Sequence, residues 1–415
     1  MRDEFDAIVV GSGPGGATVS RELSRRGKRV LLLERAADAP VDGFFSMARA
    51  FNAVRVGEKL ATARAFATGG TTAVYFGVAD EPPLDVFRNL GIDLSAQLEE
   101  AKKELPLTVL PDELLAPQVL RTRAGASELG LPWKRNQMLI DLSRCPSGFA
   151  AGARWSARLF VREAVERGAT LRSGARVTRV LLDGGKAIGV EYRIGKDEVR
   201  QAFGEWIVLA AGGAATPHIL RASGMSHAAK DGFYIHPSFS LYGTVPGLKA
   251  KESFVASWEA ELDGDLCIGD ANFDRSFYRL MMLGIGRFFR ALLHSRTIGV
   301  GVMVRDALRG ELRDDGRYHK ELSDDERAKL DRGGEVARQI LARAGARNVY
   351  AAPVSGSHVG GTIRIKEHLD DTLQTEYENL HVCDGSVIPE TVMITPTLTL
   401  VCLGKYLADR LAPGH

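Results

Sequence analysis

Gly11-Ser12-Gly13-Pro14-Gly15-Gly16 is the stretch that decides the fold of this chain. A short apolar strand is expected just before it, over residues 6–10 (DAIVV), and a helix rich in small residues over residues 14–27. A second buried strand (RVLLL) is expected over residues 29–33. Glycines at positions 11, 13 and 16 fit the GxGxxG pattern between strand and helix. The sequence therefore predicts a Rossmann βαβ unit that binds a dinucleotide.

Each residue of this turn has a predicted part in holding the dinucleotide. Gly11 permits the tight turn, Gly13 lets the pyrophosphate approach the backbone, and Gly16 lets the helix pack closely on the strand. We expect Ser12 and Gly15 to complete the site, with phosphate oxygens at the helix N-terminus. The alternative is a glycine turn that only joins a strand to a helix.

Glu34 ends the second predicted strand, and Arg35 follows it. An acidic residue near this spacing accepts hydrogen bonds from the adenosine ribose, so we expect both residues at the adenosine end of the site. If the turn is only structural, Glu34 faces solvent. The motif alone does not distinguish FAD from NAD.

Composition and charge exclude several classes of protein. The chain has 415 residues, 45% hydrophobic and 26% charged, which is ordinary for a globular protein large enough for two connected domains. Its net charge is only +2 and its basic residues are scattered, so nucleic acid is not an expected partner. Four widely separated cysteines without a CxxC pair indicate neither a metal site nor a redox disulfide. With an acidic start and no apolar stretch of roughly 20 residues, a cytoplasmic location is expected.

Three further segments resemble one known family, in the family's order along the chain. Residues 69–77 (GGTTAVYFG) look like its first signature, although Tyr75 stands where most members have Asn. Residues 213–226 (GAATPHILRASGMS) match its second signature except at Ser226. HVGGT at 358–362, followed by LHVCDGSVIPE and ITPTLTL, resembles its carboxyl-terminal block. The family is that of the glucose-methanol-choline (GMC) oxidoreductases, and the resemblance implies FAD as the cofactor.

The resemblance also implies further cofactor-binding residues and a mode of attachment. No histidine lies in the Gly69 loop region, where some members attach the flavin covalently, so noncovalent FAD is expected. The implied residues lie in the glycine-rich loop, at the adenine, after the strand that returns to the FAD domain, and in the carboxyl-terminal block: Gly69, Gly70, Thr71, Thr72, Val177, Ala211, Gly212, Asp384, Gly385, Thr395, Pro396 and Thr397.

His358 stands at the family's catalytic histidine position, and Thr395 at the second catalytic position, which is normally His or Asn. Oxidation of an alcohol needs a base for the hydroxyl proton while a hydride moves to flavin N5, and histidine suits that task. Threonine cannot act as a base at neutral pH, so we expect Thr395 to hold the substrate oxygen or the flavin edge. His236 resembles a structural residue of the loop that enters the substrate domain.

The predicted function is FAD-dependent oxidation of a hydroxyl group on a small, hydrophobic substrate by hydride transfer to flavin N5. Because Thr395 breaks the usual pair, a flavin-containing lyase, desaturase or reductase on the same fold stays open. A noncatalytic FAD-binding subunit and a nicotinamide-dependent enzyme are less favoured alternatives. The sequence does not distinguish an oxidase from a dehydrogenase, and the electron acceptor is unknown.

Residues 277–293 (FYRLMMLGIGRFFRALL) combine large apolar side chains with Arg279, Arg287 and Arg290. One interpretation is a basic amphipathic helix that contacts a membrane peripherally or lines the entrance for an apolar substrate. The favoured alternative is a core helix whose arginines extend to solvent.

The predicted fold class is α/β. A discontinuous, Rossmann-like FAD-binding domain is expected over residues 1–230 and 351–415, with a helical insertion at about 84–150. An α+β substrate-binding domain, built on a mostly antiparallel sheet, is expected over residues 231–350.

Overall fold

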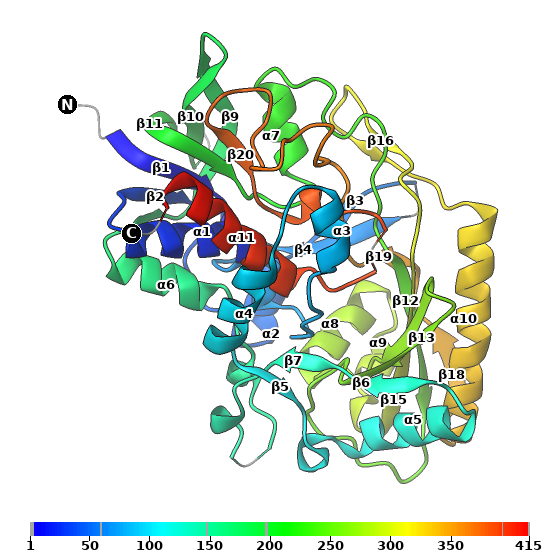
Figure 1. Ribbon diagram of the computed structural model, residues 1–415. Helices are drawn as coiled ribbons and strands as arrows, with labels where there is room; N and C mark the ends of the chain where they lie inside the picture. Colours follow the sequence, from blue (N-terminus) through cyan, green and yellow to red (C-terminus); the bar gives the residue numbers. More distant parts are fainter. Residues whose placement is uncertain (1–3, 59, 147, 196–197, 392, 414–415) are drawn as a thin grey trace.

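The computed structural model describes residues 4–58, 60–146, 148–195, 198–391 and 393–413 (Figure 1). Two large sheets organise the chain, with strand orders β8-β2-β1-β11-β10-β9 and β3-β4-β19-β12-β15-β14-β13-β6. In addition, β20 pairs with β11 in the first sheet and β18 with β12 in the second. The predicted α/β class is confirmed, and both sheets are built from segments far apart in the sequence.

The first sheet contains the predicted βαβ unit. β1 pairs in parallel with both β2 and β11, while β9, β10 and β11 form an antiparallel meander. The inner strands are continuous apolar runs because both of their faces are covered. The strands are β1 (Glu4–Val10), β2 (Val30–Leu33), β8 (Thr170–Arg172), β9 (Ala175–Asp183), β10 (Lys186–Ile194), β11 (Glu198–Leu209) and β20 (Leu380–Val382).

The helices α1 (Pro14–Arg25), α6 (Arg158–Glu166) and α11 (Thr397–Leu411) pack together beside this sheet (Figure 1). α11 lies along α1 although almost the whole chain separates them. The buried Lys405 ammonium joins them, lying 3.0 Å from Glu104 Oε2 and 3.5 Å from Glu22 Oε1. Helices α6 and α11 therefore close the dinucleotide domain.

The second sheet is antiparallel except where β4 meets β19. Its strands are β3 (Phe51–Arg55), β4 (Ala61–Ala65), β6 (Trp133–Arg135), β12 (Pro237–Thr244), β13 (Trp258–Leu262), β14 (Leu266–Asp270), β15 (Thr297–Val304), β18 (Arg347–Ala351) and β19 (Ser355–Gly356). Strands β3, β4, β6 and β19 lie outside the predicted 231–350 range, because distant segments complete the sheet. The division of the chain into domains by residue range stays a prediction.

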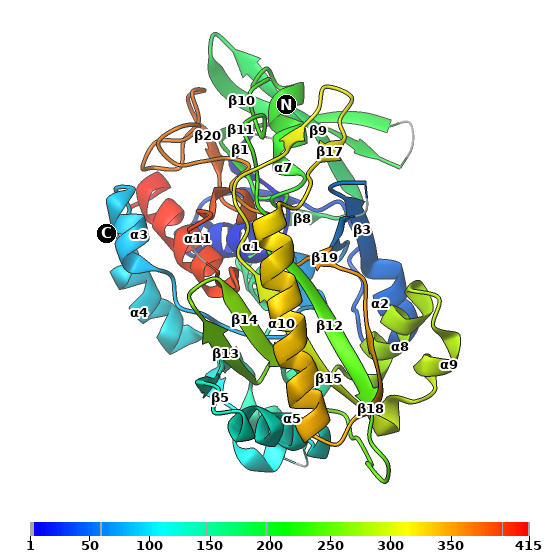
Figure 2. The ribbon, with the colours of Figure 1, turned by 90° about the vertical axis from the view of Figure 1, so that its right-hand side faces the viewer.

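One long helix, α10 (Asp324–Arg343), covers a face of the second sheet with α5 (Pro117–Glu128) at its end (Figure 2). A capping box starts α10: the Ser323 hydroxyl accepts from the Glu326 N–H, and the Glu326 carboxylate accepts from the Ser323 N–H. Two glycines, Gly333 and Gly334, let the helix approach the strands, since a Cβ on Gly333 would lie 2.4 Å from Val302. Despite its many charged residues, α10 is therefore a core element.

The remaining elements connect the two sheets. α3 and α4 lie beside α11, and α2 lies beside α8 and α9 in both views (Figures 1 and 2). They are α2 (Phe44–Ala50), α3 (Leu84–Asn89), α4 (Ser95–Glu104), α7 (Thr216–Ala222), α8 (Arg275–Gly284), α9 (Phe288–Ala291), η1 (Gly70–Ala73), η2 (Asp112–Leu114), η3 (Leu142–Arg144), η4 (Ala151–Ala153), η5 (His294–Arg296), η6 (Gly385–Val387), β5 (Leu107–Val109) paired with β7 (Gln137–Leu139), and β16 (Glu311–Leu312) paired with β17 (Tyr318–His319).

The single helix considered for 277–293 is wrong: the segment breaks between Gly284 and Gly286 into α8 and the short α9. Across the described parts of the chain, no helix is both long and apolar enough to cross a bilayer.

Candidate active site

The glycine turn between β1 and α1 is closed by backbone contacts. Gly11 has a φ of +102°, which glycine adopts at little cost. A Cβ on Gly15 would lie 2.1 Å from the carbonyl oxygen of Cys383, so this position admits only glycine. Added at Gly13, a Cβ would meet no protein atom within 4 Å. The turn is therefore packed on one side and has room for a ligand at Gly13.

Helix α1 begins at this open side with an uncapped N-terminus. Gly13 is its N-cap residue, no side chain caps the first turn, and Pro14 stands at the first helical position. The first N–H groups of a helix have no partner within the helix, and the helix dipole adds positive potential there. The backbone thus offers an anion site where the pyrophosphate is predicted.

Glu34 is buried at the end of β2, which excludes a solvent-facing side chain. Its Oε2 accepts from the Ser12 N–H at 3.0 Å and from the Ser12 hydroxyl, and its Oε1 accepts from the Ala36 N–H at 2.7 Å. The Gly69 N–H donates to Ser12 Oγ at 3.0 Å. One hydrogen-bonded chain therefore links the predicted ribose-binding carboxylate, the glycine turn and the first signature loop.

Three arginines gather near Glu34: Arg35, Arg64 and Arg176. The Arg35 and Arg64 guanidinium groups lie 4.2 and 4.6 Å from the Phe66 ring centre. Loss of hydration, together with the charges of Arg35 and Arg176, lowers the pKa of Arg64. The pKa of Arg35 is lowered in the same way, by loss of hydration and by the charge of Arg176. Among the described residues none of the three has an ion-pair partner within 4.0 Å. The cluster supplies positive potential at the adenosine end.

The first signature loop lies directly against the glycine turn. A Cβ on Gly70 would come within 2.9 Å of Gly13 Cα. Thr72 fixes the loop, because its hydroxyl donates to the Gly69 carbonyl and accepts from the Ala157 N–H at 3.0 Å. Thr71 is exposed on the same 3-10 turn.

Tyr75, which replaces the usual Asn, is anchored away from the turn. Its hydroxyl donates to the Trp155 carbonyl at 2.8 Å, and its own carbonyl accepts from Arg154 at 2.7 Å. Burial raises the pKa of Tyr75, so it stays a neutral donor. The aromatic residue therefore holds the loop onto residues 154–155.

Asp384 joins the second signature to the carboxyl-terminal block. Its Oδ2 accepts from the Gly212 N–H at 2.8 Å and from the Thr216 hydroxyl, and its Oδ1 accepts from the Ser386 N–H at 2.9 Å. Ala211 and Gly385 lie on the two turns that this carboxylate clamps. A Cβ added at Gly212 would meet no protein atom within 4 Å, as at Gly13.

Val177 is buried on β9 and contributes to the core of the dinucleotide domain. The start of this strand lies beside Glu34, since the Ala175 N–H donates to the Glu34 carbonyl at 2.8 Å. The structure therefore brings the predicted adenine contact to the same end of the first sheet as Arg35.

His358 follows β19, which lies between β4 and β12 in the second sheet, and it meets a second histidine, His236. Their Nδ1 atoms are 3.4 Å apart, with the rings nearly perpendicular. The His358 ring keeps some accessible surface, but loss of hydration lowers its pKa to about 4 while the Asp80 carboxylate opposes this shift. His358 is therefore a neutral imidazole at neutral pH.

His236 is held in a constrained backbone conformation with a φ of +45°. The Asp306 carboxylate accepts from the N–H groups of Ile235 and His236, at 3.1 and 2.8 Å, and lies 2.9 Å from the buried Lys320 ammonium. On its other side the His236 ring stacks on Tyr234 at 4.5 Å. Such strain persists only where the surroundings enforce it. The buried pair thus fixes the ring that His358 contacts.

Thr395 is paired with Asp80. The Thr395 N–H and hydroxyl donate to Asp80 Oδ2 at 2.7 and 2.8 Å. Pro396 then forms the N-cap of α11, and Thr397 is the first helical residue, without a side-chain cap. Asp80 therefore accepts the hydroxyl hydrogen of Thr395, the predicted second catalytic residue. The same carboxylate opposes the lowering of the His358 pKa.

A family model described as GMC oxidoreductase matches residues 5–238, which is more than half of the chain. The chain belongs to the GMC oxidoreductase family. An uncharacterized GMC-type oxidoreductase of Mycobacterium tuberculosis is 31% identical over 266 residues, covering 57% of this chain but 42% of the mycobacterial protein. The match thus spans less than half of that relative's length. The long-chain-alcohol oxidase FAO3 of Arabidopsis thaliana is 23% identical over 99% of this chain and 68% of its own length.

Solved structures share the fold of this GMC oxidoreductase at low sequence identity. Pyridoxine 4-oxidase from Mesorbium loti superposes with a TM-score of 0.72 and 17% identity, covering 99% of this chain and all of that one. A formate oxidase superposes with a TM-score of 0.67 and 14% identity, covering 99% of this chain and 98% of that one. The predicted resemblance and fold class are therefore confirmed.

Members of the GMC family bind FAD, and the residues of this chain fit that group. The space at Gly13 and Gly212, the uncapped start of α1 and the arginines near Glu34 suit a long, doubly charged dinucleotide. When bound there, FAD accepts a hydride.

Two residues of this GMC site, Asp80 and His236, make contacts that the sequence does not predict. Asp80 lies three residues beyond the first signature, and its closeness to Thr395 and His358 comes from contacts across most of the chain. The signal for His236 was present in its loop, but its contact with His358 depends on the packing of β12 against β19.

Proposed function

We propose that this chain oxidises a hydroxyl group of a small molecule, with noncovalent FAD as the hydride acceptor and His358 as the base. The proposal rests on His358: its Nδ1 lies 3.4 Å from Nδ1 of His236, and loss of hydration lowers the pKa of its imidazole to about 4 while the charge of Asp80 raises it. A neutral histidine can take the hydroxyl proton as the carbon loses its hydride. Asp80 favours the imidazolium that results.

The contact with His236 bears on which nitrogen of His358 acts. For the two Nδ1 atoms to share a hydrogen bond, one ring must carry its proton at Nδ1 and the other must not. We assign the donor to His358, because its Nε2 is then an unprotonated base. His236 is a positioning residue in this scheme, and the Asp306–Lys320 pair holds it in place.

The proposed substrate is small and apolar apart from its hydroxyl group. Phe76, next to the Tyr75 anchor, contacts Phe273 and Phe277 with ring centres 5.1 and 5.4 Å away. These rings give the second sheet an apolar side near the predicted flavin loop. The plant relatives named as long-chain-alcohol oxidases are consistent with such a substrate. The cytoplasmic location stays a prediction.

Noncovalent attachment of FAD is part of the proposal. Residues 69–77 contain neither histidine nor cysteine, and the loop is closed by hydrogen bonds of threonine, glycine and tyrosine. Denaturation in acid should therefore release all of the yellow chromophore from the protein.

The test of the base is anaerobic absorbance during titration with primary, secondary and long-chain alcohols. The native protein should bleach with one class, and His358→Ala should bind FAD but be reduced about 10²–10⁴-fold more slowly. His319→Gln, a partly exposed histidine on β17, is the matched control and should behave as the native protein. Reduction of the His358 variant at the native rate would refute the assignment. A native protein that turns substrate over while staying yellow would instead support the lyase alternative.

A further inference from the structure

The segment that contains α8 and α9 forms an exposed apolar surface. We define the α8–α9 lobe as residues 275–296. Among the described residues, the four most exposed large apolar side chains are Phe289 (87%), Phe45 (86%), Leu292 (72%) and Phe288 (63%). Three lie in the lobe, and Phe45 lies on α2, which packs beside α8 (Figure 2). Single exposed apolar residues are ordinary, but such a concentration marks an interaction surface.

The same lobe carries positive charge and contains no acidic residue. Residues 277–296 contain Arg279, Arg287, Arg290 and Arg296 but no aspartate or glutamate. Within the part of the chain that the structure describes, none of these four arginines has an ion-pair partner within 4.0 Å. Arg287 and Arg290 stand 4.9 and 4.6 Å from the Tyr350 ring centre. The lobe therefore carries exposed apolar side chains together with four arginines that form no ion pair among the described residues.

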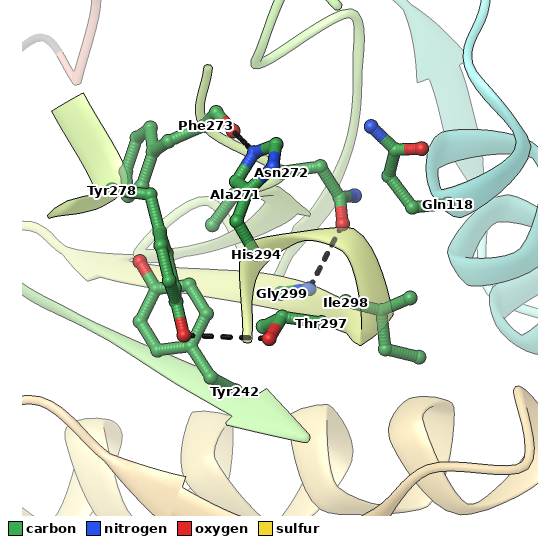
Figure 3. A pocket seen from close by; sticks show the side chains of 10 residues that line it. All are labelled: Gln118, Tyr242, Ala271, Asn272, Phe273, Tyr278, His294, Thr297, Ile298 and Gly299. Atoms are coloured by element: carbon green, nitrogen blue, oxygen red, sulfur yellow. Dashed lines mark hydrogen bonds between the residues drawn. The ribbon is translucent and has the colours of Figure 1, made fainter. Parts of the chain in front are cut away.

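The lobe is anchored firmly, so its exposed side chains do not belong to a frayed end. The Tyr278 hydroxyl donates to the Arg290 carbonyl at 3.0 Å and lies 3.1 Å from the Tyr350 hydroxyl. His294 Nε2 lies 2.9 Å from the Phe273 carbonyl oxygen. Figure 3 shows Phe273, Tyr278 and His294 among the residues around a cavity of about 10 Å³, roughly one water molecule in size. The cavity itself is too small for a substrate.

From these observations we propose that the α8–α9 lobe docks on the surface of an anionic lipid bilayer. Phe288, Phe289 and Leu292 enter the boundary between headgroups and acyl chains, and the four arginines contact the anionic headgroups. A bilayer complements both properties of the lobe at once.

Association with a second copy of this chain fits the observations less well. A two-fold dimer places the same patch against itself, so the four unpaired arginines of each copy would meet their counterparts. The lobe has no acidic residue between 277 and 296 to neutralise them. The charge pattern therefore favours lipid over self-association.

The position of the lobe connects docking to the proposed active site. Phe277 on α8 lies 5.9 Å from Phe51 and 5.4 Å from Phe76 between ring centres, and Phe76 belongs to the first signature loop. A continuous aromatic contact thus runs from the lobe to that loop. Delivery of an apolar substrate from the bilayer rests on the proposed function, whereas docking does not.

Flotation of the FAD-loaded protein with vesicles tests docking without any measurement of activity. In about 0.15 M salt, the protein should float with mixed phosphatidylcholine–phosphatidylglycerol vesicles and bind about tenfold less to phosphatidylcholine alone. F288S/F289S/L292S should lose binding to both. R279Q/R296Q should weaken only the preference for anionic lipid, because Arg287 and Arg290 remain. Because all these side chains are exposed, flavin content and melting temperature should match the native protein.

The matched control is V109S/V199S, which removes two exposed valines far from the lobe in sequence and should bind as the native protein. Failure of the native protein to float with anionic vesicles would overturn the proposal. So would equal flotation of F288S/F289S/L292S. A concentration-dependent dimer in light scattering, abolished by the same triple substitution, would assign the lobe to self-association instead. Loss of substrate turnover with intact flotation would count against the proposed function alone.

Discussion

The two sheets of this molecule contribute to the site by different means. At the first sheet, the cofactor end is shaped by backbone: Gly15 packs against the Cys383 carbonyl with no room for a Cβ, and helix N–H groups face the open side at Gly13. At the second sheet, His358, His236 and Asp80 shape the site with side chains.

This difference predicts how each end of the site responds to substitution. A backbone contact is either kept or lost as a whole. A substitution at the cofactor end should therefore either abolish flavin binding or leave it unchanged. Side chains can be exchanged without moving a strand, so the substrate end should respond in graded steps. The departure at Thr395 lies at the substrate end, where Asp80 accommodates it.

The largest effect is expected from Gly15→Ala, compared with Gly13→Ala. The Cβ at position 15 would collide with the Cys383 carbonyl, and overpacking of this kind costs about 1–3 kcal/mol or more. We expect a lower melting temperature without added FAD and almost no bound flavin. Gly13→Ala should keep the native melting temperature without FAD but bind FAD weakly, because its Cβ meets only the ligand. Absorbance ratios and thermal unfolding measure both properties.

An equal loss of stability in the two glycine variants would break this comparison. It would mean that Gly13 is also packed by protein, and that the space beside it is not reserved for the pyrophosphate.

A smaller, graded effect is expected from Asp80→Asn at the substrate end. The substitution removes the charge that favours imidazolium at His358 but keeps an oxygen to accept from Thr395. Loss of about 1–2 kcal/mol of stabilisation corresponds to about tenfold slower flavin reduction in stopped-flow measurements. Flavin content should not change. Asp183→Asn, at the exposed end of β9, is the control, and equal rates for both variants would exclude an electrostatic role for Asp80.

The most gradual effect is a dependence of stability on pH that both sheets share. Loss of hydration lowers the pKa of His358, at the second sheet, and of His381, on β20 of the first, to about 4. Between about pH 6.5 and 4 the unfolded chain binds a proton at each histidine and the folded chain does not. The free energy of unfolding should therefore fall as the pH decreases through this window.

Urea unfolding of the flavin-free protein at several pH values measures this slope. His358→Gln and His381→Gln should each reduce it by about one proton. If neither substitution changes the slope, other titratable groups cause the acid sensitivity.

Much of the fold could be predicted where the signal is local. The βαβ unit, the helix over 158–166 and the closing helix from Thr397 follow from apolar periodicity and glycine positions within short windows. The residues that make up the second sheet could not be predicted, because β3, β4 and β6 pair with strands that are far away in the sequence. At the site, signature motifs placed His358 and Thr395 in the sequence. No local pattern connects Asp80 with Thr395, since only the folded chain brings them together.

The contact between Gly15 and Cys383 has a consequence for how the enzyme is made. Proteins leave the ribosome amino terminus first, at about 5–20 residues per second. The glycine turn emerges early, but β11, β20 and α11, which complete its surroundings, come much later. We therefore expect nascent chains to hold no flavin until translation has passed α11.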